Sequence, residues 1–339
     1  MNPPDMRSEG FPEPMMELLR KYVLGGIVHP LPSGMESIEI GRVTMTMFYF
    51  GAYKLLFPEK PLKDVVNVDA VSKYLLETLR VKSNDPSVFN GFTGCEVFGS
   101  FKQGHISYTY AALASLSQLG YDLRRIDKTS ITSTIPNLFK PGNKGVFATS
   151  LPDECEHDVR FVYSLCAVCY LLNDWSFVDK TKLFDFIMSC RSYDFAFGQV
   201  PLRESHGGST FCAIQSISLM GMLDKLTYVD ELVQWLVQKS YLGFSGRINK
   251  PADTCYTYWI GATLKTLGCE ALIDKKFVLA FVESCVSKKY GGVSKNGDSI
   301  PDPMHTFCSL TGLSLIGALP VSYVIDSRIG IERPSYLSN

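Results

Sequence analysis

The sequence carries almost no net charge. It has 33 lysines and arginines against 34 aspartates and glutamates, which leaves a formal net charge of −1 at pH 7. Without a basic excess there is no electrostatic reason for the chain to bind nucleic acid or an anionic membrane. The sequence also lacks any run that approaches the ~20 apolar residues of a membrane span. We therefore expect neither a nucleic-acid partner nor a membrane span.

Cysteine is too scarce for a disulfide scaffold, with 10 residues in a chain of 339. Cys166 and Cys169 stand in the apolar run FVYSLCAVCYLL, and a single C-x-x-C pair predicts buried helix cysteines rather than a metal site. The first residues, MNPPDMRSEGFPEP, are polar and rich in proline, so we expect no signal peptide and a loose tail over residues 1–15. Together these features predict a cytoplasmic protein.

A repeated pattern dominates the rest of the chain. Apolar segments of about 15 residues alternate with connectors rich in glycine and proline, and strand-like alternation is scarce, which predicts an all-α protein. Five segments share a register in which a polar residue stands five positions before an aromatic one. These pairs, 47 to 53 residues apart, are His105/Tyr110, Asp158/Tyr163, His206/Phe211, Asp253/Tyr258 and Asp302/Phe307. A period near 50 indicates a repeated helical hairpin.

Helical hairpins can stack as an open solenoid or close into a ring with a central cavity. The polar residues of the shared register all precede their helices, so they should gather at one mouth of the array. That arrangement favours a ring with a funnel. The simpler interpretation is that these residues only cap their helices, which accounts well for the aspartates and poorly for the histidines.

One helix begins with a D-x-C motif formed by Asp253 and Cys255. His305 stands close to the same register one repeat later. Because neighbouring repeats touch, a carboxylate, a thiolate and an imidazole can converge here. Three such ligands are typical of an open zinc site, whose fourth position is left for a substrate. We expect one Zn²⁺ per chain.

Side chains that could bind an anion surround this motif. Arg247 and Lys250 precede it, Tyr256 follows it, and His206 begins the preceding helix beside two glycines. Together with the amides of a helix N-terminus, these side chains suit a diphosphate, although Arg247 and Lys250 alone could be a solvated basic rim. A thiolate held by the metal could then attack a carbon whose leaving group is diphosphate.

Four stretches carry a family resemblance: ESHGGSTFCAIQSISLMG, GRINKPADTCYTYWIGATLKTLG, EHDVRFVYSLCAVCYLLNDWS and GHISYTYAALASL. Over roughly residues 40–320 the chain resembles the β subunits of protein prenyltransferases, and within them those of type I protein geranylgeranyltransferase. The resemblance implies an α/α barrel (toroid) of about six helical hairpins that forms a single domain over residues 1–339. It also implies an obligate heterodimer with a prenyltransferase α subunit.

The reaction implied is transfer of geranylgeranyl from geranylgeranyl diphosphate to the cysteine of proteins, such as small GTPases, that end in a CaaX box with X mostly Leu or Phe. The resemblance also carries residue roles to this sequence. They are Asp253, Cys255 and His305 as catalytic zinc ligands; His206, Arg247, Lys250, Tyr256 and Lys295 for the diphosphate; Thr44, Phe48 and Trp259 for the lipid cavity; and His105, Glu156, Arg160 and Met304 for the peptide.

Three positions discriminate within the family. Thr44 stands where farnesyl enzymes carry a bulky Trp in the lipid cavity, which leaves room for a fourth isoprene unit. Lys295 stands where they carry a magnesium-binding Asp, so magnesium should not be required. Met304 stands where farnesyl enzymes have Tyr and type I enzymes Leu, and it keeps that part of the peptide pocket apolar.

Other functions remain possible at this stage. A farnesyltransferase β subunit is disfavoured by Lys295, and a Rab geranylgeranyltransferase β subunit by the peptide-binding set. A non-catalytic helical-repeat scaffold would need neither the three metal ligands nor the anion set. A terpene cyclase on the same fold is disfavoured because there is no Asp-rich motif and because carbocation chemistry does not need D-x-C.

Overall fold

The protein was analysed as a computed structural model that describes residues 10–30, 36–97, 103–139, 142, 145–151, 156–320 and 324–337. Within these ranges the chain forms α-helices joined by short 3-10 turns and isolated β-bridges. The helices are α1 (Glu13–Val28), α2 (Arg42–Leu56), α3 (Val68–Lys73), α4 (Ile106–Gln118), α5 (Thr129–Thr132), α6 (Val159–Leu172), α7 (Lys180–Ser189), α8 (Gly207–Leu219), α9 (Val229–Val237), α10 (Tyr256–Thr266), α11 (Lys275–Ser284) and α12 (Pro303–Leu315). The 3-10 turns are Glu36–Gly41, Leu62–Asp64, Leu123–Arg125, Ile135–Leu138, Leu223–Lys225 and Glu270–Leu272, and a π-helical turn at Tyr74–Thr78 follows α3.

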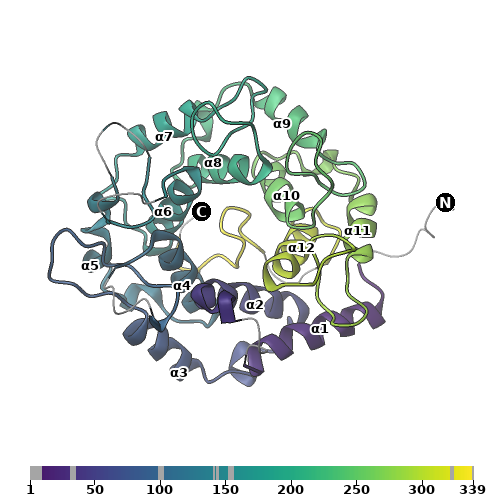
Figure 1. The fold of residues 1–339 in the computed structure, drawn as a ribbon, viewed down its shortest axis with the longest axis horizontal. Helices are drawn as coiled ribbons and strands as arrows, with labels where there is room; N and C mark the ends of the chain where they lie inside the picture. Colours follow the sequence, from purple (N-terminus) through teal and green to yellow (C-terminus); the bar gives the residue numbers. More distant parts are fainter. Residues whose placement is uncertain are drawn as a thin grey trace.

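The even-numbered helices form a closed inner ring. Each packs against the next along the chain, and α12 returns to pack against α2. The odd-numbered helices lie outside this ring, so each pair from α1–α2 to α11–α12 is one helical hairpin (Figure 1). This closure rules out an open solenoid, and the predicted α/α barrel of about six hairpins is confirmed.

Burial differs between the two rings in the way that the sequence pattern predicts. Inner helix α6 is buried along nearly its whole length, including Cys166 and Cys169, as expected for those cysteines. Outer helix α9 buries one face through residues such as Leu232 and Trp235 and exposes its polar face. A helix that is apolar all round belongs inside a fold, whereas an amphipathic one covers it.

Four of the five register residues are the N-caps of inner helices, and the fifth accepts a similar bond. His105 and His206 accept a backbone N–H through Nδ1, and the carboxylates of Asp158 and Asp302 do the same. Asp253 accepts the N–H of Cys255, at 3.0 Å. The expectation that capping accounts poorly for the histidines is therefore wrong, because an imidazole nitrogen can replace the usual side-chain oxygen as acceptor.

A second contact recurs four residues after the cap. Thr109, Thr210 and Thr306 each accept, through Oγ1, a backbone N–H of the preceding connector, at 2.9 Å, 3.1 Å and 2.9 Å. These bonds fix each connector against the start of its own inner helix. They help to hold the starts of α4, α8 and α12 in equivalent positions.

At the N-terminus, residues 1–9 of the expected tail lie outside the described residues, and α1 begins at Glu13, inside the expected range of 1–15. No helix in the part of the chain that the structure describes is both long and apolar enough to cross a membrane.

The ring depends on close backbone approach between α10 and α12. A Cβ at Gly312 would overlap the backbone of Thr257 and Tyr258, whereas a Cβ at Gly25 of α1 meets no atom within 4 Å. Gly312→Ala should therefore lower the free energy of unfolding by several kcal/mol, while Gly25→Ala should raise it by up to ~1 kcal/mol because alanine favours the helix. Urea unfolding of both variants measures this, and equal stabilities would contradict the close packing at Gly312.

Candidate active site

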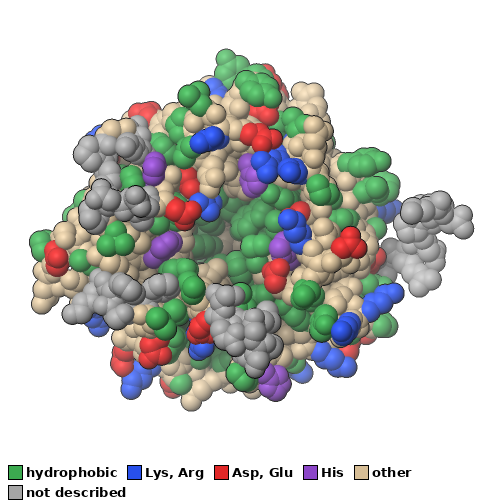
Figure 2. Space-filling model, in the orientation of Figure 1, with side chains coloured by type: hydrophobic (Ala, Val, Ile, Leu, Met, Phe, Trp, Pro, Cys, Tyr) green, Lys and Arg blue, Asp and Glu red, His purple; other side chains and the backbone are tan. Residues whose placement is uncertain are grey.

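The ring encloses a cavity of about 1240 Å³ that opens at one mouth. The space-filling view shows this hollow at the centre of the molecule, with hydrophobic side chains inside and charged and histidine side chains around the rim (Figure 2). All three side chains predicted for the lipid cavity, Thr44, Phe48 and Trp259, line it. The cavity therefore combines an apolar interior with a polar entrance.

The aromatic residues of the shared register form the wall of this cavity. Tyr110, Tyr163, Phe211, Tyr258 and Phe307 all line it, one from each of five successive inner helices. Neighbouring rings in this series lie 5.0 to 6.0 Å apart between centroids, and Phe48 of α2 continues the series 5.3 Å from Phe307. The sequence did not predict this wall, although the fixed position of each aromatic residue after its cap is the signal that could have done so.

The three predicted zinc ligands converge at the mouth. Asp253 and Cys255 lie at the start of α10, and His305 lies in the first turn of α12. One possible ligand atom from each of the three lies within 4.8 Å of the others, and all three residues are buried. Asp253 Oδ1 is 3.3 Å from His305 Nε2.

The protonation of these groups follows from burial and from their contacts. Burial raises the pKa of the Cys255 thiol well above its ordinary value, and the nearby Asp253 carboxylate raises it further. Burial also opposes ionisation of Asp253 and His305, but their hydrogen bonds and nearby charges together outweigh it. Hydrogen bonds from His305 and Cys255 lower the pKa of Asp253, and the bonds to Asp253 and Asp302 raise the pKa of His305 to about 9.

The donor set fits a zinc ion. Oxygen, sulfur and nitrogen ligands from three residues are typical of zinc sites that keep one position open. His305 is also oriented as zinc-binding histidines are, because its Nδ1 lies 2.5 Å from Asp302 Oδ2 and its Nε2 faces the cluster. Asp302 therefore has a second role beside its cap, which the sequence analysis did not assign.

A smaller pocket of about 320 Å³ adjoins the cluster. It brings together all five side chains predicted to bind diphosphate, and Asp253 belongs to its lining as well. These five are His206, Arg247, Lys250, Tyr256 and Lys295. Lys250 and Lys295 are exposed, and Arg247 is held by Glu204 at 2.9 Å. Three cations around one pocket at the start of α8 and α10 favour an anion there.

Hydrogen bonds determine which atoms of His206 and Tyr256 donate and which accept. The N–H of Gly208 donates to His206 Nδ1, at 3.1 Å, so the proton of the neutral ring is on Nε2. Burial and the nearby Arg247 lower the pKa of His206, which favours this neutral form. Nε2–H can then donate to the Tyr256 hydroxyl oxygen, 2.8 Å away. The hydroxyl proton of Tyr256 is left to donate to a ligand in the pocket.

The residues predicted to bind a peptide carboxylate are only partly brought together. Glu156 and Arg160 line the large cavity and lie 3.3 Å apart, with Arg160 also paired to Asp158 at 2.7 Å. His105 lies near them, because its ring is 5.8 Å from that of Phe161, over which the Arg160 guanidinium lies at 5.3 Å. Burial and the charge of Arg160 lower the pKa of His105 to about 4. His105 and Met304 are not among the lining residues found for either cavity in the described part of the chain.

The fold and the site together define an α/α toroid with a metal-ligand cluster and an anion pocket at one mouth. The chain matches the prenyltransferase alpha-alpha toroid domain over residues 17–329, and it belongs to that family. It is 38% identical over 313 residues to the geranylgeranyl transferase type-1 subunit beta of Arabidopsis thaliana, which covers 84% of this chain and 81% of the relative.

A second relative, the geranylgeranyl transferase type-1 subunit beta of Dictyostelium discoideum, is 42% identical over 213 residues, 62% of this chain and 60% of the relative. Among solved structures, Candida albicans protein geranylgeranyltransferase-I complexed with GGPP matches with a TM-score of 0.82 at 22% identity, covering 95% of this chain and 97% of that one. This likeness supports the fold. The two sequence relatives confirm the resemblance to type I β subunits.

Metal binding to this cluster should release protons. At neutral pH the Cys255 thiol and His305, with its pKa of about 9, are both protonated without a metal, whereas Asp253 is ionised. Zinc added to the metal-free protein should therefore bind once per chain and release about two protons, and its affinity should fall as the pH falls. Calorimetry in buffers of different ionisation enthalpy measures the number of protons released.

Cys255→Ala should weaken zinc binding by orders of magnitude and reduce the release to about one proton. Cys269→Ala is the matched control, because Cys269 is a partly buried cysteine outside the cluster. Unchanged zinc affinity in Cys255→Ala would exclude this cluster as the metal site.

Proposed function

We propose that this chain is the catalytic β subunit of a zinc-dependent protein geranylgeranyltransferase of type I. The observation that carries this proposal is the position of Asp253, which borders both the metal-ligand cluster and the anion pocket. Its Oδ1 lies 3.3 Å from His305 Nε2 in the ligand cluster, and its Oδ2 lies 3.7 Å from Lys295 Nζ in the cation-lined pocket. A thiolate held by the cluster and a diphosphate held by the pocket would therefore be neighbours. The identity to two type-1 β subunits favours geranylgeranyl as the transferred group.

Asp253, Cys255 and His305 would hold the metal, with Asp302 orienting His305. A zinc ion bound there would keep the cysteine thiol of the protein substrate ionised at neutral pH. The burial of the three ligands would keep bulk water away from that sulfur. Attack of the substrate cysteine sulfur on C1 of the prenyl diphosphate would form a carbon–sulfur bond. The carbon–oxygen bond breaks with its electron pair on the diphosphate, and the thiol proton passes to solvent.

The pocket residues would stabilise the charge that grows on the leaving diphosphate. Arg247, Lys250 and Lys295 supply positive charge, and Tyr256 donates the proton that its bond to His206 leaves available. Donors already placed around a developing anion lower the barrier because they need no reorganisation during the reaction. Lys295 would take the place of magnesium, so magnesium should not be required.

The large cavity suits the rest of the substrate pair. Its 1240 Å³ and its aromatic wall favour a long apolar chain, and the small side chain of Thr44 leaves room at α2. Glu156 and Arg160, with His105 beside them, would bind the C-terminal carboxylate of a CaaX protein through a water molecule. We further propose an α subunit as obligate partner, substrates such as small GTPases, and a cytoplasmic location.

The first test is a transfer assay of the chain co-purified with its α subunit. A peptide ending in Cys-aliphatic-aliphatic-Leu is offered with geranylgeranyl or farnesyl diphosphate, with magnesium chelated and bound zinc quantified. Geranylgeranyl transfer without magnesium and one zinc per chain would support the proposal. Farnesyl preference with a magnesium requirement would indicate a farnesyltransferase, a requirement for an escort protein would indicate a Rab-type enzyme, and absence of both zinc and transfer would indicate a scaffold.

Replacing Lys295 tests its role directly. Lys295→Asp should lower magnesium-free turnover by roughly 10- to 100-fold, because a cation beside the diphosphate becomes an anion. Added magnesium should restore much of the loss. Lys288→Asp is the matched control, an exposed lysine outside the pocket that should leave turnover unchanged. Turnover of Lys295→Asp that ignores magnesium would contradict the role assigned to Lys295.

A further inference from the structure

The C-terminal segment forms a hairpin that enters the barrel from the end opposite the mouth. Figure 1 shows this segment, in yellow, inside the inner ring. A bridge between Ile325 and Glu332 joins its two sides. Its base lies near the C-terminal ends of inner helices, since Ser327 Oγ is 2.8 Å from the hydroxyl of Thr266, the last residue of α10. We refer to residues 325–332 as the C-terminal hairpin.

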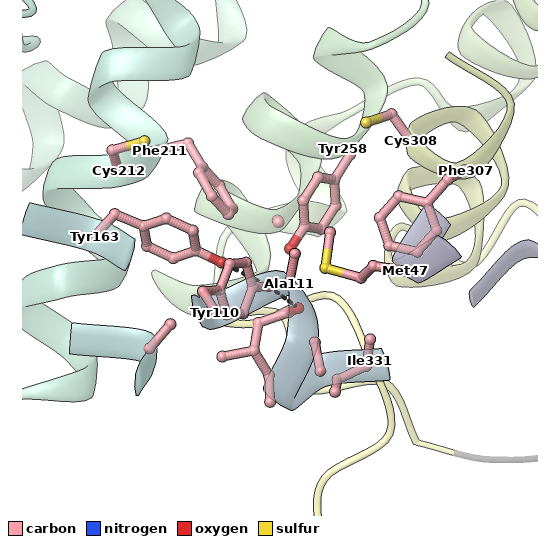
Figure 3. Close-up of a cluster of buried hydrophobic side chains, with 14 of the residues drawn as sticks. Met47, Tyr110, Ala111, Tyr163, Phe211, Cys212, Tyr258, Phe307, Cys308 and Ile331 are labelled. Atoms are coloured by element: carbon pink, nitrogen blue, oxygen red, sulfur yellow. Dashed lines mark hydrogen bonds between the residues drawn. The ribbon is translucent and has the colours of Figure 1, made fainter. Parts of the chain in front are cut away.

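The tip of the C-terminal hairpin reaches deep into the ring. The Tyr110 hydroxyl donates to the backbone carbonyl of Ile329, at 2.7 Å, and the Tyr163 hydroxyl donates to that of Arg328, at 3.0 Å. Figure 3 shows these two tyrosines beside Phe211, Tyr258 and Phe307 in the centre of the barrel. Both tyrosines follow their helix caps by five residues, which is only about 7.5 Å of helix at 1.5 Å per residue.

Further contacts hold the base of this turn. Arg328 pairs with the Asp326 carboxylate at 2.7 Å, and both groups contact the Tyr170 hydroxyl of α6. Gly330 has a φ of +70°, and a side chain there would clash with the Tyr258 hydroxyl, so the return strand passes close to α10. Contacts with α4, α6 and α10 therefore fix the position of the tip along the barrel axis.

Ile329 is the residue of the C-terminal hairpin that lines the large cavity. Only 1% of its surface is exposed, so Ile329 is packed in the core and borders the cavity with a small part of its surface. Because the core encloses the rest of the residue, a larger side chain should encroach on the cavity and a smaller one should deepen it. The cavity above Ile329 extends from His206 at the mouth to Thr44 and Phe48 on α2.

We propose that Ile329 forms the floor of the prenyl site and helps to set the chain length that the cavity accepts. This inference rests on the proposed function, because it takes the apolar cavity as the site of the prenyl group. Phe48 and Thr44 limit the site from the side of α2, whereas Ile329 limits it from below. Discrimination between prenyl diphosphates then depends on the C-terminal hairpin as well as on α2. A difference of one methylene in an apolar pocket changes kcat/KM by roughly 10- to 200-fold, and an isoprene unit has five carbons.

The test uses the chain co-purified with its α subunit and prenyl diphosphates of 15, 20 and 25 carbons. Ile329→Phe should lower the ratio of kcat/KM for geranylgeranyl over farnesyl diphosphate by about tenfold or more. Ile329→Ala should shift the preference the other way and raise use of the 25-carbon diphosphate. Ile331→Ala is the matched control, since Ile331 is a buried isoleucine of the same hairpin that does not belong to the lining found for the cavity.

Binding of the same three diphosphates, measured by calorimetry, separates this inference from the proposed function. If the parent complex binds them but transfers none, the proposed function fails, and the binding preferences of the Ile329 variants still test the floor. If the parent complex transfers geranylgeranyl and both Ile329 variants keep its chain-length preference, the role proposed for Ile329 is wrong, whereas the proposed function stands. A shift of equal size in Ile331→Ala would also overturn it, because general loosening of the hairpin would then be the cause. If Ile329→Phe does not assemble, Ile329→Ala and Ile329→Val decide by the same criterion.

Discussion

The site depends on the common direction of the inner helices. The helices of the shared register begin at the same mouth, as the contacts between their starts show: His206 meets Tyr256, and Asp253 meets His305. Their partial positive N-terminal charges therefore add in one place. Residues that lie about 50 positions apart in the chain become neighbours there. Neither the metal-ligand cluster nor the anion pocket could form if the α9–α10 hairpin were reversed, because both take residues from the start of α10.

The same polar residues cap these helices and face the site, and the two roles are coupled. The cap bond uses Nδ1 of His206, which fixes the tautomer and leaves Nε2–H for Tyr256. Asp302 binds the backbone N–H of His305 with one oxygen and its ring with the other. The position of each side chain is thus set by the backbone of the helix that it starts. Such second contacts place reactive groups more accurately than packing alone would.

The sequence predicted the parts of this structure that leave a periodic or chemical pattern. The repeat near 50 residues and the shared register predicted the ring, and D-x-C with His305 predicted the cluster that the structure brings together. The capping role of His105 was not predicted, because imidazole is an unusual cap. The C-terminal hairpin was not predicted either, because Tyr110 and Tyr163 bind backbone carbonyls of that segment, and every residue has a carbonyl.

The cavity also determines the orientation of an amphiphilic ligand. Charged side chains of both signs, including the three cations of the anion pocket, surround the mouth, whereas uncharged groups such as Phe211, Phe307 and Ile329 line the deep wall. Burial raises the pKa of Tyr110 and Tyr163, so the hydroxyls that hold the hairpin stay neutral. A diphosphate placed at the floor would lose its hydration beside a cation that is already paired, since Arg328 binds Asp326, and this is strongly unfavourable. Under the proposed function, a prenyl diphosphate would therefore bind in one direction, with its charged end at the mouth beside Lys250 and Lys295 and its chain above the hairpin.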